Sequence, residues 1–175
     1  MTTPQFWSPA HSPWLGQGDL FLTAPLVATQ TNGSAVTSEI ILAPALLASH
    51  DCALDKVNAR GVMQATHVTF LPLRSLTVLE GNRANIVRSN NVTPYDFFFV
   101  GVLPGLGESY LSLNTPSTVT LDYFEPELRM FPGDSEAHLV AQRNDTRIGT
   151  LSSAQLELFR TKWNVYWTRR LPQPT

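Results

Sequence analysis

The chain has 175 residues, of which 15% are charged and 43% are hydrophobic, and its formal net charge at pH 7 is −2. This length suits one domain with a substantial core. The low charge content excludes an intrinsically disordered chain and a long solvated helix, and the near-neutral charge gives no general attraction to nucleic acids or membranes.

Residues 1–18 are expected to form an N-terminal arm, and residues 19–175 a single domain. Prolines at positions 4, 9 and 13 are too closely spaced for a regular helix. Trp7 and Trp14 require apolar surroundings, so we expect the arm to pack across the domain.

From Asp19 to Arg143, short runs rich in Val, Ile and Thr are separated by Gly, Pro and Asn, a pattern that predicts strands. Asn32-Gly33 predicts the turn of the first hairpin, and Gly81-Asn82 a second reversal. No helical pattern separates these runs, which favours an antiparallel barrel or sandwich. The predicted strands are Asp19–Ala28, Ser38–Ser49, Met63–Pro72, Ala84–Ser89, Asp96–Leu103, Tyr110–Leu113, Thr118–Phe124 and Ala137–Gln142.

The C-terminal segment changes to a helical period. Ser152 and Gln155 have the spacing of a capping box. An apolar stripe at spacings of three and four then predicts one amphipathic helix over about residues 153–169, with the stripe packed in the core. The stripe consists of Leu156, Phe159, Trp163 and Trp167.

Four short motifs occur in a fixed order along the chain: Gly18-Asp19-Leu20-Phe21, Ala43-Pro44-Ala45-Leu46-Leu47-Ala48-Ser49, Phe70-Leu71-Pro72-Leu73-Arg74-Ser75 and Arg147-Ile148-Gly149-Thr150-Leu151-Ser152. In this order they resemble motifs of the PemK/MazF family of toxin–antitoxin ribonucleases. The resemblance implies an SH3-like antiparallel β-barrel with inserted hairpins and one C-terminal helix. It also implies an RNA substrate, cleavage without metal or other cofactor, a homo-oligomer and an antitoxin partner.

Two departures from the family pattern affect the expected chemistry. Ala43 stands where the family has an arginine, and Arg74 where it has a threonine, whereas Ser75 is retained. An alanine cannot stabilise the charge that develops on a phosphate during cleavage. If the chain cleaves RNA, we expect Arg74 to supply that charge, Ser75 to orient the phosphate and His50 to transfer the proton. The sequence leaves open whether cleavage is retained.

Arg83 and Arg88 lie in a polar, mildly basic stretch that we predict to be a hairpin. Arginines in such a hairpin would contact RNA phosphates, and the alternative is an ordinary solvated turn.

The tetrapeptide Ser49-His50-Asp51-Cys52 follows an apolar strand and has three interpretations. Cys52 could be a nucleophile activated by an imidazole. Alternatively, Cys52 is a small buried residue and Asp51 caps a turn, which we favour. A metal site of His50, Asp51 and His67 has no diagnostic spacing, so we predict no metal.

The alternative function is a non-enzymatic phage virion or assembly protein built on the same SH3-like barrel. Low surface charge and an N-terminal arm rich in Pro and Trp favour it. No apolar run approaches the length of a membrane span, so we expect no membrane partner. The expected location is the cytoplasm, or a virion under the alternative.

Overall fold

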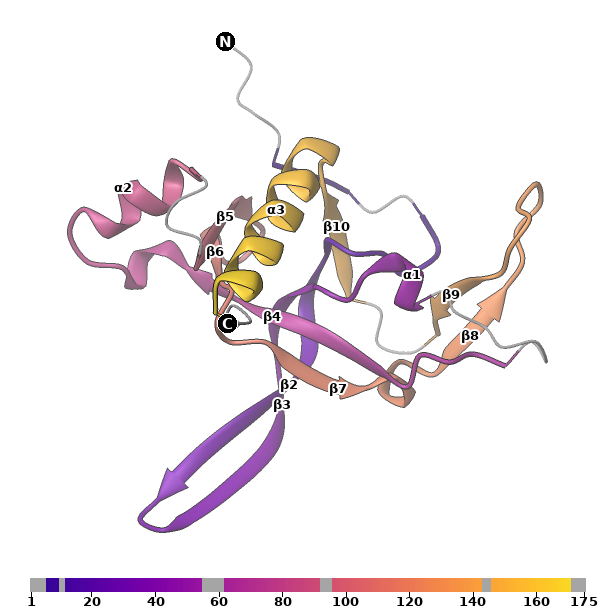
Figure 1. The fold of residues 1–175 in the computed structure, drawn as a ribbon, viewed down its shortest axis with the longest axis horizontal. Coiled ribbons are helices and arrows are strands. Elements are labelled where there is room, and N and C mark those ends of the chain that lie inside the picture. The colour runs from indigo at the N-terminus through magenta and orange to yellow at the C-terminus, as the bar shows by residue number, and fades with distance from the viewer. Residues whose placement is uncertain (1–5, 10–11, 55–61, 92–95, 143–145, 171–175) are drawn as a thin grey trace, which may run out of the picture.

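The computed structural model describes residues 6–9, 12–54, 62–91, 96–142 and 146–170. Most of the strands form one eight-stranded antiparallel sheet, in the order β1-β10-β2-β3-β4-β6-β5, with β7 also paired to β4 (Figure 1). A second sheet pairs β8 (Pro126–Arg129) with β9 (His138–Ala141). The strands of the large sheet are β1 (Trp7–Ser8), β2 (Asp19–Asn32), β3 (Ala35–Leu47), β4 (His67–Ser75), β5 (Phe97–Leu103), β6 (Gly107–Ser112), β7 (Ser117–Thr120) and β10 (Arg147–Leu151).

The helices are few. A single α-helix of more than six residues lies in the described part of the chain, α3 (Ser153–Arg170), and it packs against the large sheet. The short helical segments are α1 (Asp51–Leu54), α2 (Arg83–Arg88) and the 3₁₀ turns η1 (Leu76–Val78) and η2 (Leu121–Phe124). The prediction of a mainly β, antiparallel fold with one C-terminal helix is confirmed. The hydrogen-bonded strand order runs open from β1 to β5, and closure into an SH3-like barrel stays a prediction.

The core lies on both faces of the large sheet, because side chains alternate along each strand. On β2 and β3, Phe21 and Leu47 pack on one face with residues of β7, η2 and β9. Leu20 and Leu46 pack on the other face, beneath Phe159 of α3. The apolar strands read from the sequence therefore form the middle layer of the molecule.

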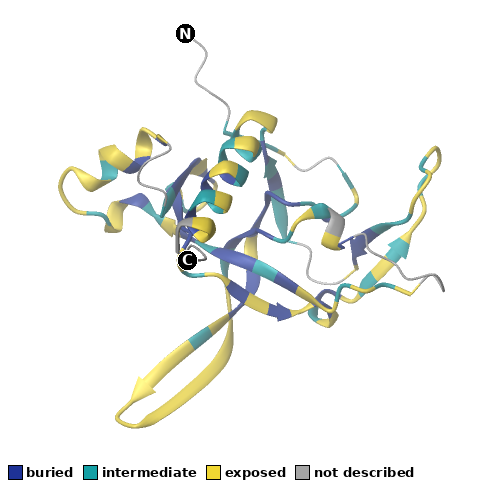
Figure 2. Ribbon diagram, in the orientation of Figure 1, coloured by how far each residue is buried: buried dark blue, intermediate teal, exposed yellow. Residues whose placement is uncertain are grey.

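The hairpin of β2 and β3 extends well beyond the body (Figure 1). The predicted reversal is confirmed, but its two loop positions are Gly33 and Ser34, one residue beyond the predicted Asn32-Gly33; Gly33 has a φ of +62°, as in a type II′ turn. Both strands continue further toward this turn than predicted. Residues 29–42 are all exposed, and Ala28 and Ala43 at the base of the hairpin are half-buried (Figure 2).

Some predicted strands are wrong in whole or in part, and the one predicted at Met63–Pro72 begins only at His67. The strand predicted at Ala84–Ser89 is helix α2, in which the N–H of Ile86 donates to the Asn82 carbonyl and that of Ser89 to Asn85. The β-branched Ile86 and Val87 suggested a strand, but no neighbouring strand satisfies this backbone, and local hydrogen bonds do so instead. The strand predicted at Thr118–Phe124 ends early, because η2 begins at Leu121. Strands β1, β8 and β10 were not predicted.

Helix α3 has the predicted bounds to within one residue at its C-terminal end, but its buried stripe differs. Phe159 is fully buried, as expected, whereas Trp167 is 41% exposed. Lys162 and Tyr166 are buried instead. Lys162 is accommodated because its Nζ donates to the Phe97 carbonyl over 2.7 Å. Trp167 therefore does not belong to the core.

The predicted capping box is replaced by other contacts. The Gln155 side chain accepts from Asn90 Nδ2, and the Ser152 N–H donates to the carbonyl of Phe6. Gln155 thus connects α3 to the end of α2 instead of closing on its own N-terminus.

The described part of the arm packs on the body. Strand β1 pairs with β10, and the Trp7 indole donates to the Val102 carbonyl over 3.0 Å. The Trp14 ring stacks on His138 with centroids 4.5 Å apart. No helix in the described part of the chain is both long and apolar enough to span a membrane.

Candidate functional site

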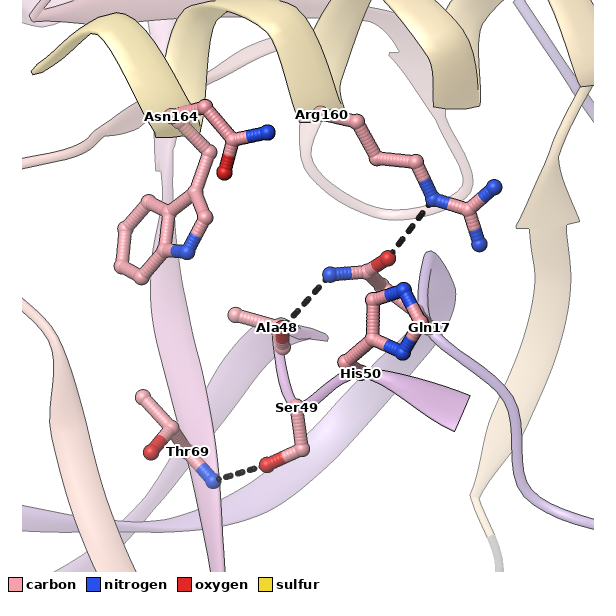
Figure 3. Close-up of a pocket in the computed structure, with 8 residues that line it drawn as sticks. Gln17, Ala48, Ser49, His50, Thr69, Arg160 and Asn164 are labelled. Atoms are coloured by element: carbon pink, nitrogen blue, oxygen red, sulfur yellow. Dashed lines mark hydrogen bonds between the residues drawn. The ribbon is translucent and has the colours of Figure 1, made fainter. Parts of the chain in front are cut away.

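An open pocket of about 350 Å³ lies where β3 ends, between the start of α1, strand β4 and helix α3 (Figure 3). Its size lies at the lower end of the range for small-ligand sites. The lining combines an indole, an imidazole, a guanidinium, amides and hydroxyls. The lining residues are Gln17, Ala48, Ser49, His50, Thr69, Arg160, Trp163 and Asn164.

The end of β3 positions the residues of the pocket floor. The N–H of Ala48 donates to the Thr69 carbonyl, and the Ser49 hydroxyl accepts from the Thr69 N–H over 2.8 Å. After β3 has ended, the Ser49 side chain therefore adds one more hydrogen bond to the β3–β4 pairing. The carbonyl of His50 then accepts from Ala53 as α1 begins, which leaves the His50 side chain exposed at the pocket.

Arg160 is held by three acceptors. Its Nε donates to Gln17 Oε1 over 2.8 Å, Nη2 to Asp51 Oδ2 over 3.0 Å and Nη1 to Glu157 over 3.1 Å. The Gln17 amide also donates to the Ala48 carbonyl, so Gln17 joins α3 to the end of β3 (Figure 3). The guanidinium is fixed in place, and the Asp51 and Glu157 carboxylates offset much of its charge.

The interpretation of Asp51 changes with these contacts. Besides Arg160, its carboxylate accepts from the backbone N–H of Gln17 over 2.6 Å. Asp51 therefore connects the start of α1 to the end of the arm and to α3, contacts made across the fold and not within a turn. The side chain of Cys52 lies outside the described part of the chain.

The three residues predicted to form a catalytic site do not share this pocket. His50 lines it, whereas Arg74 and Ser75 lie at the far end of β4, about 17 Å along the strand from Thr69. Arg74 is exposed, and the Ser75 hydroxyl caps η1 by accepting from the Thr77 N–H. Arg74 pairs with Tyr110 of β6, whereas Ala43 pairs with Ala24 of β2.

Arg83 and Arg88 lie at the two ends of α2, and the hairpin predicted for them is corrected to a helix. Arg88 forms a bidentate pair with Glu108, with both N–H···O distances 2.8 Å, and also donates to Asn85. This pairing raises the pKa of Arg88 and lowers that of Glu108. The guanidinium of Arg83 lies over the Phe97 ring, 5.7 Å from its centroid. Arg88 is therefore already engaged by a carboxylate.

Among the described residues, no three or more His, Cys, Asp or Glu side chains lie close enough together to hold a metal ion. Asp51 points to Gln17 and Arg160, and His67 lies beside Thr66 at the start of β4. The triad considered from the sequence is not assembled.

Sequence reasoning missed five of the eight lining residues. The sequence predicted only a strand at Thr69 and a helix at Trp163 and Asn164, with no indication of a binding role. Trp163 was predicted to pack in the core. Gln17 and Arg160 come together only because the arm crosses α3, 143 residues apart in sequence. In the sequence, the tetrapeptide Ser49-His50-Asp51-Cys52 after an apolar strand pointed to this place, and two of its residues, Ser49 and His50, line the pocket.

Comparison with protein-family models gives no match, and no significantly similar protein is found among the curated proteins.

Proposed function

We propose that the chain is an RNA-contacting module of the PemK/MazF-like type and that the pocket at the end of β3 binds the RNA. The observation that carries this proposal is the combination of Trp163 with His50, Ser49 and Asn164 around one open pocket. An indole stacks on any nucleobase, and hydroxyl, amide and imidazole groups hydrogen-bond to base edges, ribose and phosphate.

Arg160 has a positioning role in this proposal. Its donors already engage Gln17, Asp51 and Glu157, so its main contribution is to hold the pocket wall. Arg74 and Ser75 contact the same RNA outside the pocket, further along β4, where Arg74 is exposed and offers its charge to a phosphate.

Cleavage, where it occurs, runs without metal. His50 removes the proton of a ribose 2′-hydroxyl, the 2′-oxygen attacks the adjacent phosphorus, and the bond to the 5′-oxygen breaks as that oxygen takes up a proton from water. The products carry a 2′,3′-cyclic phosphate and a 5′-hydroxyl. With RNA as substrate the expected location is the cytoplasm, and an antitoxin would act by covering the pocket.

The test is to incubate the full chain with a long unstructured RNA in the presence of EDTA and to map the ends of any fragments. Binding is measured in parallel by titration at several salt concentrations, because each neutralised phosphate contributes a slope of about −0.7 for single strands. Discrete cuts with cyclic phosphate ends support the nuclease, and saturable binding without cuts supports a binding module. Absence of both overturns the proposal.

A non-enzymatic assembly protein is the second candidate. The observation that favours it is the long exposed hairpin of β2 and β3, whose strands hold only one ionisable residue, Glu39, between Val27 and Leu42. Deletion of the hairpin would abolish assembly in this case and leave RNA binding unaffected if the first proposal holds.

A further inference from the structure

Along the hairpin of β2 and β3, the backbone N–H and C=O groups of successive residues point alternately toward the other strand and away from it. The N–H of Val27 donates to the Ser117 hydroxyl over 2.7 Å, so it points away from β3. Val27 is paired with Ile40, so the backbone groups of Ile40 point away from β2. Pro25 agrees with this assignment, because it lies two residues before Val27 and has no N–H to donate to β3.

The same alternation defines the outer side of β3. The register is unbroken from the Ala24↔Ala43 pair to the turn, so every second residue of β3 points its backbone groups outward. On this side no described strand pairs with β3 from residue 36 to residue 42, and β4 pairs with it only at residues 45–47. We call this row of exposed residues, about 20 Å long, the β3 edge (Figure 2). It consists of Val36, Ser38, Ile40 and Leu42.

The two ends of the large sheet are covered, in contrast to the β3 edge. On β5, the Asn90 side chain bonds to both the N–H and the carbonyl of Phe99, and Lys162 Nζ donates to the Phe97 carbonyl. At the other end of the sheet, the short strand β1 pairs with β10. Uncovered strand edges are templates for pairing, and proteins usually block them with such devices.

The outer edge of β2 is partly closed as well. The Ser117 hydroxyl takes the N–H of Val27, and Pro25 has none. Beside this contact, Val27 and His67 line a groove of about 260 Å³ at the base of the hairpin. Among the described residues of the hairpin, the β3 edge is therefore the longer row of backbone groups open to a further strand.

We propose that the β3 edge binds an extended segment of a different protein, which pairs with β3 as an additional antiparallel strand. In this mode of recognition, main-chain hydrogen bonds supply the affinity and alternate side chains supply the specificity. A row of outward N–H and C=O groups at the spacing of a strand is complementary to another strand and to no helix.

Glu39 indicates the chemistry of the partner. It is the only ionisable residue of the hairpin between Val27 and Leu42, and its carboxylate contacts the neutral amide of Gln30 over 3.3 Å. A lysine or arginine opposite Glu39 on the added strand forms a favourable cross-strand pair. Strand β3 itself holds no lysine or arginine, so a second β3 edge cannot supply this cation. The partner is therefore an extended segment of another protein with a basic residue at that position.

The test uses two synthetic nine-residue peptides, one that alternates valine with lysine and one that alternates valine with glutamate. Each is titrated into the ¹⁵N-labelled full chain without RNA, and binding is followed by amide chemical shifts and amide hydrogen exchange. A pairing strand protects the outward N–H groups of Ser38 and Ile40. The N–H groups of Thr37 and Glu39 point toward β2 and serve as the internal control.

Two substitutions at one position separate the backbone from the side chain. Ser38→Pro removes one outward N–H, and proline is tolerated in an edge strand where the N–H faces solvent. Ser38→Ala keeps the N–H and is the matched control. We expect the valine–lysine peptide to bind the unaltered chain and Ser38→Ala equally, and Ser38→Pro about fivefold more weakly or less, because a main-chain hydrogen bond is lost.

The charge of Glu39 is tested separately, in a variant that keeps every backbone group. We expect the valine–glutamate peptide to bind the unaltered chain about fivefold more weakly than the valine–lysine peptide, and Glu39→Lys to reverse this preference. Equal binding of both peptides, or no reversal, overturns the basic partner.

The proposal is overturned as a whole if the valine–lysine peptide does not bind or if Ser38→Pro binds it unchanged. Protection of Ser38 and Ile40 that rises with the concentration of the chain alone would also overturn it, because a second copy would then occupy the edge. The pocket proposed for RNA lies at the opposite end of β3, so failure of this proposal and failure of the RNA proposal are distinguishable.

Discussion

The Asp19 carboxylate accepts a 2.9 Å hydrogen bond from the Arg147 guanidinium, and both side chains are almost completely buried. Asp19 begins β2 and Arg147 begins β10, two neighbouring strands of the sheet. The same carboxylate accepts from the N–H of Gly16, and the same guanidinium donates to the carbonyl of Trp14. One buried ion pair therefore joins the start of β2 to the start of β10, and it also binds the backbone of the N-terminal arm at Trp14 and Gly16.

Removal of one member of this pair is expected to be strongly destabilising. Arg147→Met leaves the Asp19 carboxylate buried without its cation, which lowers the free energy of unfolding by about 3–5 kcal/mol. The double variant Asp19→Leu, Arg147→Met removes both charges and is expected to lose less. Urea unfolding of the two variants measures the difference, and an equal loss in both would contradict this account.

The pKa of Asp19 is expected to lie above its ordinary value of 3.8, because burial disfavours the charged carboxylate more than Arg147 favours it. The folded chain then holds this proton more tightly than the unfolded chain. The contribution of Asp19 to stability is therefore fully present at low pH and declines as the pH rises through the folded-state pKa. A carboxyl ¹³C NMR titration measures the pKa directly, and a midpoint below 3.8 would overturn the assignment.

Burial lowers the pKa of Lys162 to about 8, an effect that Asp96 partly opposes. The folded chain loses this proton at a lower pH than the unfolded chain, whose lysine titrates at about 10.5. The free energy of unfolding is therefore expected to gain a rising contribution between about pH 8 and 10.5. Lys162→Met should remove this rise, and Lys56, outside the described residues, provides the control variant Lys56→Met, which should retain it. Urea unfolding across this pH range makes the comparison.

Gly149 allows β1 to approach β10. A Cβ atom at this position would overlap the Ser8 carbonyl oxygen and the Trp7 ring. Gly149→Ala is expected to displace β1 and to lower the free energy of unfolding by about 1–3 kcal/mol. Gly16→Ala is the control, because its Cβ would meet only Asp51 at an ordinary 3.5 Å. Amide hydrogen exchange at Trp7 and Ser8 should increase in the first variant, and unchanged protection there would contradict the prediction.

The RNA proposal predicts different effects for two exposed histidines. His50 lines the pocket at the end of β3, whereas His67 lines the groove at the base of the hairpin. His50→Ala is expected to reduce cleavage by about 100-fold or more if His50 transfers the proton. His67→Ala should leave it unchanged.

Trp163→Leu tests binding at the same pocket. Loss of the indole is expected to weaken RNA binding by about 1–3 kcal/mol through lost stacking. Trp167→Leu, on the exposed part of the same helix, is the matched control. Equal binding by both variants would remove the pocket from the proposal.

Much of the fold was predictable because local patterns and the tertiary structure agree. Alternation along β2, β3 and β4 places apolar residues on both faces of the sheet, as the apolar runs in the sequence indicated. The prediction failed at Ala84–Ser89, where two β-branched residues suggested a strand. There the chain forms a helix, and just beyond its C-cap Ser89 the residue Asn90 adopts a φ of +49° and its side chain bonds to both the N–H and the carbonyl of Phe99.

The site was less predictable than the fold. His50 was identified because a polar tetrapeptide follows an apolar strand, a purely local signal. Its neighbours in the pocket come from the arm, β4 and α3, and no local pattern brings them together. Arg74 is far from His50 because the pocket lies beside Thr69, near the start of β4, and Arg74 lies near the end of that strand. No local pattern in the sequence gives this distance.

The sequence by itself determined the mainly β class, the reversal near Asn32-Gly33 and the C-terminal helix, because hydrophobic period, turn chemistry and helix-ending residues act over a few neighbouring positions. Only the tertiary structure decided that Lys162 is buried and Trp167 exposed, that Arg160 meets Gln17 and Asp51, and that the hairpin extends beyond the body. These features depend on contacts between residues far apart in the chain, whose free energies no local pattern contains.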